Sequence, residues 1–288
     1  ILKLGGKRIR PVLCLMGNEL FTEIHPDAWT VAKGIELFHN FTLIHDDIMD
    51  RAPLRRGKPT VHSVFNESSA LLAGDVMLLK AYEYFISTAP GRVQQLIGLL
   101  NETGRLVCEG QQLDMDFESS FTVTLADYLY MIERKTAVLL AASLQMGAII
   151  AGAEEADQQH LYAFGRNLGL AFQVQDDWLD AFGDPATFGK QTGGDIMQNK
   201  KTFLLMRALE SANAMQKRDI LQLLDEPGPG KVQKMLSLFR TCGADLAAET
   251  AQQQYLGDAL THLEAVQVPS ERKEPLRELA LGLLKRNA

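Results

Sequence analysis

Cysteine is scarce in this sequence, and its three residues, Cys14, Cys108 and Cys242, lie far apart. Their odd number argues against a disulfide framework, and their spacing matches no zinc-binding pattern. We therefore expect ordinary buried thiols in a reducing compartment, and hence a cytoplasmic protein.

Long apolar runs and a basic charge balance are also absent. The longest apolar run, around 138–153, is interrupted by Ser143, Gln145 and Gly147, so no stretch approaches the roughly 20 residues that span a bilayer. The formal net charge is -7, which argues against a general nucleic-acid or anionic-membrane surface. A local cationic pocket for an anionic substrate is still compatible with that balance.

Strand signals are missing as well, because no stretch alternates strictly between apolar and polar residues. Apolar residues instead recur at three- and four-residue spacing, which is typical of amphipathic helices. We predict a single all-α domain over residues 1–288, built as a bundle of about ten or more helices around a central cleft. Since the chain opens at Ile1 without Met, we also expect an N-terminal segment to be missing.

Apolar periodicity and the positions of proline and glycine set the expected helices. The first begins at Pro26 and stops before Pro53. The others cover roughly 69–87, 91–117, 125–151, 154–181, 195–209, 215–224, 231–240, 245–263 and 271–285.

Two aspartate clusters are the sharpest functional signal. Residues 46–50 read DDIMD at the end of one predicted helix, and residues 176–180 read DDWLD at the end of another. In each, the first and last carboxylates share a helix face, where they repel one another and oppose the helix dipole. A bound cation would compensate, and oxygen ligands favour Mg²⁺. One such cluster could be a solvated helix end, but two in apolar helix faces favour a metal.

Basic residues gather near these clusters in the sequence. The charges would balance around a phosphorylated substrate. Carboxylates would bind Mg²⁺, and Mg²⁺ together with Arg and Lys would bind the phosphate groups. In the opening GGKRIR segment, Lys7 and Arg10 are spaced to share a helix face. The other basic residues of this group are Arg55, Arg56, Lys190, Lys200 and Lys201.

The order of motifs extends this pattern over about two-thirds of the chain, from Gly5 to Thr202. The motifs are GGKRIRP, LIHDDIMDRAPLRRGKPTVH, LLAGD, GQQLD, ERKTAVLL, FQVQDDWLD, FGKQTGGD and NKKT. This order resembles the trans-isoprenyl diphosphate synthase (polyprenyl synthetase) family.

The resemblance implies a Mg²⁺-dependent prenyltransferase that condenses isopentenyl diphosphate with an allylic diphosphate. The expected product is a short-chain all-trans prenyl diphosphate, geranylgeranyl or farnesyl. A homodimer with about three Mg²⁺ ions per active site is implied by the resemblance alone.

The resemblance also implies roles for individual residues. The metal ligands would be Asp46, Asp50 and Asp176, supported by Asp47, Asp177 and Asp180. The allylic diphosphate would be held by Arg55, Lys135, Lys190 and Lys200. Isopentenyl diphosphate would be held by Lys7, Arg10, His39 and Arg56. Thr136 and Gln173 would line the reacting centre, with Gln111 and Asp114 as polar residues behind the metal side. The catalytic group would be Asp46, Asp50, Asp176, Lys135 and Gln173.

Other interpretations stay open for some of these residues. His39 could be a core histidine, and the Lys135–Thr136 pair could belong to a solvated helix turn. Phe38, Phe41 and Thr42 precede the first cluster, where they could limit product length or simply pack in the core. At the level of function, the alternatives are a class I terpene cyclase and a non-catalytic partner subunit of a prenyl synthase.

Overall fold

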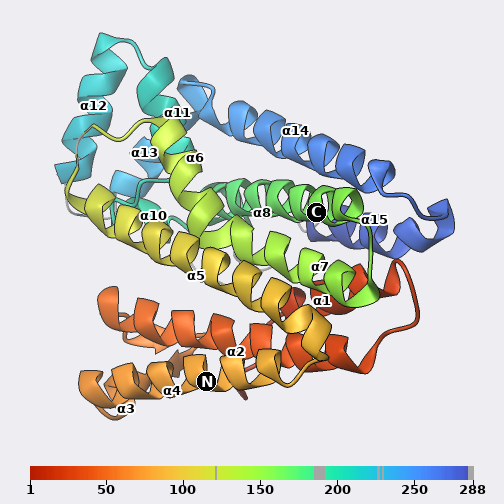
Figure 1. Ribbon diagram of the computed structural model, residues 1–288. Helices are drawn as coiled ribbons and strands as arrows, with labels where there is room; N and C mark the ends of the chain where they lie inside the picture. Colours follow the sequence, from red (N-terminus) through yellow and green to blue (C-terminus); the bar gives the residue numbers. More distant parts are fainter. Residues whose placement is uncertain (121, 185–191, 226–227, 229, 285–288) are drawn as a thin grey trace. The chain divides into compact units, whose positions relative to one another are not determined.

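The computed structural model of the protein describes residues 1–120, 122–184, 192–225, 228 and 230–284. Helices account for most of them (Figure 1). The strands in this part of the chain are β1 (Leu54–Arg55) and β2 (Lys58–Pro59), which pair in an antiparallel hairpin. The predicted all-α fold is therefore confirmed.

The chain forms two compact units, each built from segments that are separate in sequence. The first unit consists of Ile1–Arg105, Leu139–Gly165 and Glu264–Pro275. The second unit consists of Leu106–Val138, Arg166–Leu263 and Leu276–Ala288. The single domain over residues 1–288 stays a prediction.

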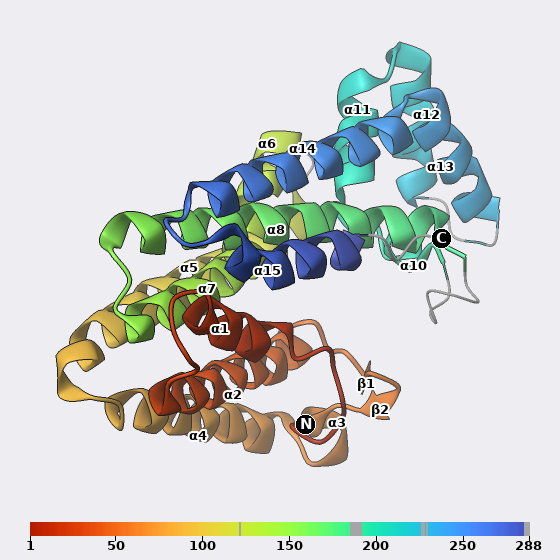
Figure 2. The ribbon, with the colours of Figure 1, turned by 90° about the vertical axis from the view of Figure 1, so that its right-hand side faces the viewer.

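The first unit is organised around α2 (Pro26–Met49), which packs against α1 (Ile9–Glu19) and α4 (Glu67–Ile86) (Figure 2). Pro26 begins α2 because its fixed φ suits the first helical position, and the His25 side chain accepts the Asp27 N–H at 3.1 Å. Gly34 allows the close approach of α4, since a Cβ there would lie 2.7 Å from the Phe85 ring. The unit also contains α3 (Val61–Val64), the beginnings of α5 (Pro90–Ser119) and α8 (Glu155–Phe182), and most of α7 (Val138–Ala151).

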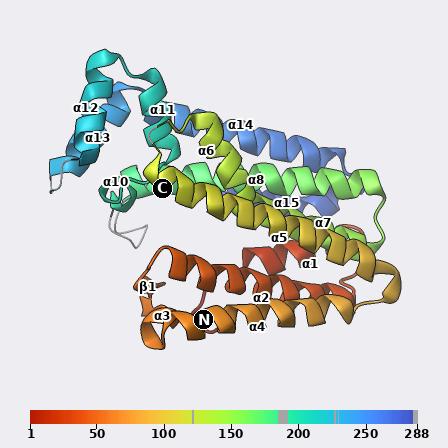
Figure 3. The same cartoon turned by 60° about the vertical axis from the view of Figure 1, so that its left-hand side comes forward.

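The second unit surrounds the rest of α8. Its core includes Tyr128, Val174, Phe203, Met235 and Phe239. A capping box between Thr124 and Asp127 begins α6, which packs against α11 (Figure 3). Besides α8, the elements are α6 (Leu125–Ile132), η1 (Glu133–Ala137), α10 (Gly194–Met197), α11 (Phe203–Ser211), α12 (Ala214–Asp225), α13 (Gly230–Thr241), most of α14 (Ala244–Ala265) and the end of α15 (Ser270–Leu284).

Three local predictions need correction. The helix expected over 195–209 is broken into α10 and α11, because Asn199 adopts a left-handed φ of 56° and Thr202 is an extended N-cap. α1 begins only at Ile9, so Lys7 precedes it and does not share a helix face with Arg10. Cys108 is exposed rather than buried.

The stretch Leu125–Ala151 bears on the expected absence of a membrane span. By length and composition it is the one helical stretch in the described residues that could cross a membrane. However, 72% of its apolar window is buried inside the structure, so it is packed as a core helix.

Candidate functional site

The first aspartate motif lies at the end of α2, where its carboxylates differ in exposure. Asp46 is partly exposed and Asp50, the C-cap, is exposed, whereas Asp47 is buried. Arg55 of β1 compensates the buried charge, since its Nε and one terminal nitrogen each lie 2.7 Å from Asp47 Oδ1. The first and last carboxylates are therefore left on the accessible side of the helix end.

The β1–β2 hairpin carries two consecutive arginines of the predicted site. Its turn residues Arg56 and Gly57 both have positive φ, 53° and 72°, as type I′ turns require. Arg55 pairs with Asp47, while the Arg56 guanidinium donates to the Gly5 carbonyl. The hairpin therefore ties the opening segment of the chain to the surroundings of the first motif.

Three of the four residues predicted to hold isopentenyl diphosphate lie in one cationic cluster. A terminal nitrogen of Arg10 is 3.1 Å from His39 Nε2. Burial, and then the charges of Arg10 and Arg56, hold the pKa of His39 well below its usual value. Burial and Arg56 together lower the pKa of Arg10 to about 10. Burial lowers the pKa of Arg56 as well, with Arg8 adding to the effect.

Burial is the largest cause of all three lowered pKa values, and the positive charge of neighbouring arginines adds to each. The arrangement is suited to a polyanion, whose binding would relieve the repulsion. The fourth predicted residue, Lys7, is exposed in the segment before α1. The contact between His39 and Arg10 fits both interpretations of His39, as a substrate contact and as a core histidine with a satisfied hydrogen bond.

The second aspartate motif, on α8, repeats the pattern of the first. Asp176 and Asp180 are partly exposed, and Asp177 is buried. Asp177 accepts hydrogen bonds from the Tyr128 hydroxyl, from the Phe203 N–H at 2.7 Å and from the Gln173 amide at 3.1 Å. Burial raises the pKa of Asp177 to about 7, and these three donors oppose that rise.

Lys135 and Thr136 lie in η1, a single π-helical turn between α6 and α7. π-turns inside α-helices often occur at functional sites. Lys135 Nζ lies 2.5 Å from Asp114 of α5, and the Thr136 hydroxyl donates to Gln173 Oε1 at 3.4 Å. Gly110 allows this packing, because a side chain there would collide with the Lys135 backbone.

A polar chain therefore runs through the second unit from Thr136 to Gln173, Asp177 and Tyr128. It joins two predicted reacting-centre residues to the buried carboxylate of the second motif. Gln111, a neighbour of Gly110, is buried, and neither atom of its amide has a hydrogen-bond partner among the described residues.

The lysines that follow the second motif are only partly placed. Lys190 lies outside the described residues. Lys200 is exposed and lies 3.4 Å from Asp195, whereas Lys201 donates to the Glu118 carbonyl at 3.4 Å. The Asp195 N–H in turn donates to Asp180 at 3.0 Å, so the second motif helps to fix this segment.

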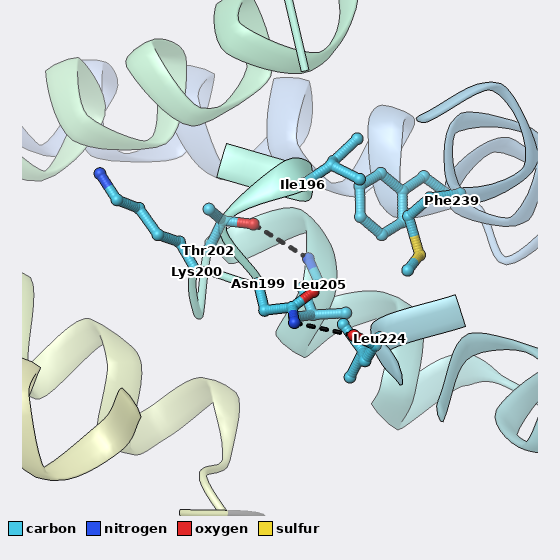
Figure 4. A pocket seen from close by; sticks show the side chains of 8 residues that line it. Ile196, Asn199, Lys200, Thr202, Leu205, Leu224 and Phe239 are labelled. Atoms are coloured by element: carbon cyan, nitrogen blue, oxygen red, sulfur yellow. Dashed lines mark hydrogen bonds between the residues drawn. The ribbon is translucent and has the colours of Figure 1, made fainter. Parts of the chain in front are cut away.

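A pocket beside Lys200 does not resemble a diphosphate site. Figure 4 shows the Lys200 side chain extending away from Ile196 and Phe239. Among the polar side chains that line the pocket, the Asn199 amide already donates to the Leu224 carbonyl at 2.8 Å. The lining residues are Ile196, Asn199, Lys200, Thr202, Leu205, Leu224, Met235 and Phe239.

Aromatic residues line α2 before the first motif. Phe38 is buried and lies edge-on to Phe41, with ring centroids 5.6 Å apart. Phe41 in turn meets the His45 ring at 4.7 Å. Thr42 donates its hydroxyl to the His39 carbonyl at 2.9 Å. Two of the residues predicted to limit product length, Phe38 and Phe41, therefore contact one another, and the same contact is also core packing.

The accessible carboxylates have the chemistry that Mg²⁺ prefers. In the part of the chain that the structure describes, no three His, Cys, Asp or Glu side chains form a metal site on their own. Mg²⁺ is commonly bound by one or two carboxylates together with substrate phosphates, rather than by an all-protein cage. Asp46, Asp50 and Asp176 fit that mode, because each is at least partly exposed at a motif whose middle carboxylate is otherwise engaged.

Sequence reasoning missed Tyr128, Arg8 and Glu36. Tyr128 occupies an ordinary apolar position of an amphipathic helix, 49 residues from the carboxylate it contacts. Arg8 forms an ion pair with Glu36 of α2. The available signal for Glu36 was its place as an acidic residue one turn before His39.

Comparison with known proteins gives consistent matches. The family model described as polyprenyl synthetase matches residues 1–241. A short chain isoprenyl diphosphate synthase of Methanothermobacter thermautotrophicus is 38% identical over 283 residues, covering 98% of this chain and 87% of the relative. A geranylfarnesyl diphosphate synthase of Natronomonas pharaonis is 37% identical over 271 residues, covering 87% and 78%. The crystal structure of a geranylgeranyl pyrophosphate synthetase from Pyrococcus horikoshii matches with a TM-score of 0.93 and 34% identity, covering 98% of this chain and 86% of that one.

Proposed function

Since this chain belongs to the polyprenyl synthetase family, we propose that it joins isopentenyl diphosphate to an allylic diphosphate. It is a prenyltransferase of the short-chain trans-prenyl diphosphate synthase type. We propose geranylgeranyl diphosphate as the main product, with farnesyl diphosphate as the alternative, and a cytoplasmic location.

The observation that carries this proposal is the pattern of burial and exposure that the two aspartate motifs share. In both, the middle carboxylate is buried and engaged by protein groups, while the first and last are at least partly exposed. Like charges four residues apart on a helix repel one another. A metal bound together with a diphosphate would lower that repulsion.

Asp46 and Asp50 would hold Mg²⁺ at the first motif and Asp176 would do so at the second, with roughly three ions in all. Bound Mg²⁺ would stabilise the negative charge that develops on the departing diphosphate. Arg55 stays beside Asp47 and adds a fixed positive charge there. Lys135, Lys190 and Lys200 would supply the remaining cations for the allylic diphosphate.

The cluster of Arg10, His39 and Arg56, with Lys7, would hold isopentenyl diphosphate. Its geometry suits a diphosphate, because guanidinium groups bind phosphate oxygens in a fork. Holding the two substrates at separate cationic sites would orient the isopentenyl double bond toward the allylic carbon.

The reacting centre would use Thr136 and Gln173 as oriented dipoles that face an allylic cation. Their hydrogen bonds to one another and to Asp177 fix these dipoles before substrate arrives. His39 is a poor base, because its surroundings depress its pKa. We therefore assign the proton lost after coupling to the departing diphosphate.

We propose a homodimer in which a second copy covers the outer face of α4. Leu72, Val76, Leu79 and Ile86 form an apolar stripe along that helix, interrupted by the exposed Glu83, and each of the four is more than half exposed. Large exposed apolar patches often mark protein–protein contacts. A helix of a second copy presenting the same stripe would bury it symmetrically.

One assay tests the proposed function. The protein is incubated with labelled isopentenyl diphosphate, one allylic diphosphate at a time, and Mg²⁺, and the dephosphorylated products are sized by chromatography. We expect labelled trans-prenyl products, mainly of twenty-carbon length. Cyclised hydrocarbon from the allylic substrate alone would indicate a terpene cyclase, and no product with any primer would indicate a non-catalytic subunit.

A further inference from the structure

Glu36 is an acidic residue placed beside the cationic cluster of the first unit. Its side chain is only 16% exposed. The carboxylate accepts hydrogen bonds from the Arg8 guanidinium and from the Asn40 amide, the latter at 2.7 Å. Because a carboxylate repels a diphosphate, Glu36 is unsuited to bind the substrate itself.

Arg8, the partner of Glu36, has an unusual backbone conformation. Its φ and ψ of 50° and 32° are left-handed, although it is not glycine. It is the N-cap of α1, where its side chain makes no capping hydrogen bond. Residues with side chains avoid this conformation unless their surroundings hold them in it. The ion pair with Glu36 and a hydrogen bond to the Leu2 carbonyl provide such a hold.

The backbone at Arg8 determines where two predicted substrate contacts lie. Lys7 directly precedes Arg8, and Arg10 lies within the first turn of α1, which begins at Ile9. The Arg8 carbonyl accepts the Val12 N–H at 3.2 Å, so this residue also sets the start of the helix. A change in the Arg8 conformation would therefore move Lys7 and Arg10 together.

We propose that Glu36 is a positioning residue for isopentenyl diphosphate. Its ion pair with Arg8 holds the segment from Lys7 to Arg10 in its binding conformation against repulsion from Arg56. The proposal rests on the proposed function and deepens it, because it assigns the specificity of one substrate site to a residue that does not touch substrate. A purely structural ion pair would instead affect stability without distinguishing the two substrates.

The test compares steady-state kinetics of the full-length protein for each substrate. Glu36→Gln keeps the side-chain shape and removes the charge. We expect its KM for isopentenyl diphosphate to rise by about ten- to a hundredfold, and its KM for the allylic substrate to stay within about twofold. The double variant Arg8→Glu with Glu36→Arg rebuilds the pair in reverse and should recover most of the loss.

Glu102→Gln is the matched control, because it breaks an exposed Glu–Arg pair on α5 within the same unit. It should leave both KM values unchanged. If the wild-type protein is active and Glu36→Gln has an unchanged KM for isopentenyl diphosphate, the positioning role alone is overturned. An equal rise in KM for both substrates in Glu36→Gln would also overturn it. Wild-type protein that makes no product at all would overturn the proposed function and this role with it.

Discussion

The carboxylates of Asp47 and Asp177 are buried in two separate parts of the chain, and each is compensated in its own way. Arg55 supplies a full charge to Asp47, whereas neutral donors from Tyr128, Gln173 and the Phe203 backbone serve Asp177. A buried carboxylate without such partners would be costly. In both motifs the middle aspartate therefore helps to hold its end of the helix in place.

Tyr128→Phe tests this role at the second motif. Burial and Asp177 raise the pKa of Tyr128 well above its usual value, so the hydroxyl remains a donor. Its removal should lower the free energy of unfolding by about 1.5–3 kcal/mol, the range for hydrogen bonds to charged groups. Turnover should fall as well, because Asp177, which also holds Gln173, loses a hydrogen-bond donor.

Tyr130→Phe is the control, since Tyr130 is more than half exposed on the same helix. Thermal unfolding and turnover are measured for both variants. Equal stability of the two variants would show that the Tyr128 hydroxyl does not support Asp177.

The two cationic sets should separate kinetically. Arg10→Ala and Arg56→Ala should mainly weaken isopentenyl diphosphate, as should Lys7→Ala. Arg55→Ala and Lys190→Ala should mainly weaken the allylic substrate or slow its ionisation. Each loss should be roughly 2–5 kcal/mol where the contact is buried. KM values measured for both substrates check the partition, which is wrong if every variant affects both equally.

At the scale of elements, proline and apolar periodicity predicted most helices to within a few residues. Pro26 and Pro53 bracketed α2, and its motif fell at the helix end as expected. The π-turn η1 escaped prediction, because one inserted residue barely disturbs the apolar period. The break before α11 escaped as well, since it depends on the left-handed Asn199 and the Thr202 cap within a sequence that reads as helical.

The candidate site was predictable where motifs are local and unpredictable where partners are distant. Arg55 and Asp47 are separated by eight residues, and their proximity followed from one short turn. The pairs Tyr128–Asp177 and Arg8–Glu36 join residues 49 and 28 positions apart. Such contacts depend on tertiary packing, which the sequence pattern of either element does not carry.

We propose that product length is limited by residues of α2. If Phe41 limits the growing chain, Phe41→Ala should give longer products, because it opens volume beside Phe38. Thr42→Phe should shorten them. Overpacking a close-packed wall costs roughly 1–3 kcal/mol, and this cost would disfavour the bound longer product. Chromatography of dephosphorylated products measures both.

Phe38→Ala should act weakly alone and strongly together with Phe41→Ala. Phe38→Ala also opens space beside Gly104. The Phe38 ring lies close to Gly104, since a Cβ added there would be 3.4 Å from the ring. An unchanged product distribution in active Phe41→Ala would place the limit on another helix.

At the scale of the whole molecule, the exposed stripe on α4 predicts association. Leu79→Arg places a charge in the centre of that stripe and should convert dimer to monomer in light scattering after gel filtration. Leu246→Arg is the control, because Leu246 is similarly exposed on α14, outside the stripe. A monomeric wild-type protein, or an unaffected dimer in Leu79→Arg, would contradict the assignment of this face.

The central claim is that the accessible aspartates serve metal and substrate rather than the fold. Turnover of Asp46→Ala and Asp176→Ala under saturating substrates and Mg²⁺ tests it most directly, with exposed Asp116→Ala as the control. We predict a loss of about three orders of magnitude or more in both variants, with helical circular dichroism and thermal unfolding close to wild type. Turnover within about tenfold of wild type in either variant would contradict the claim.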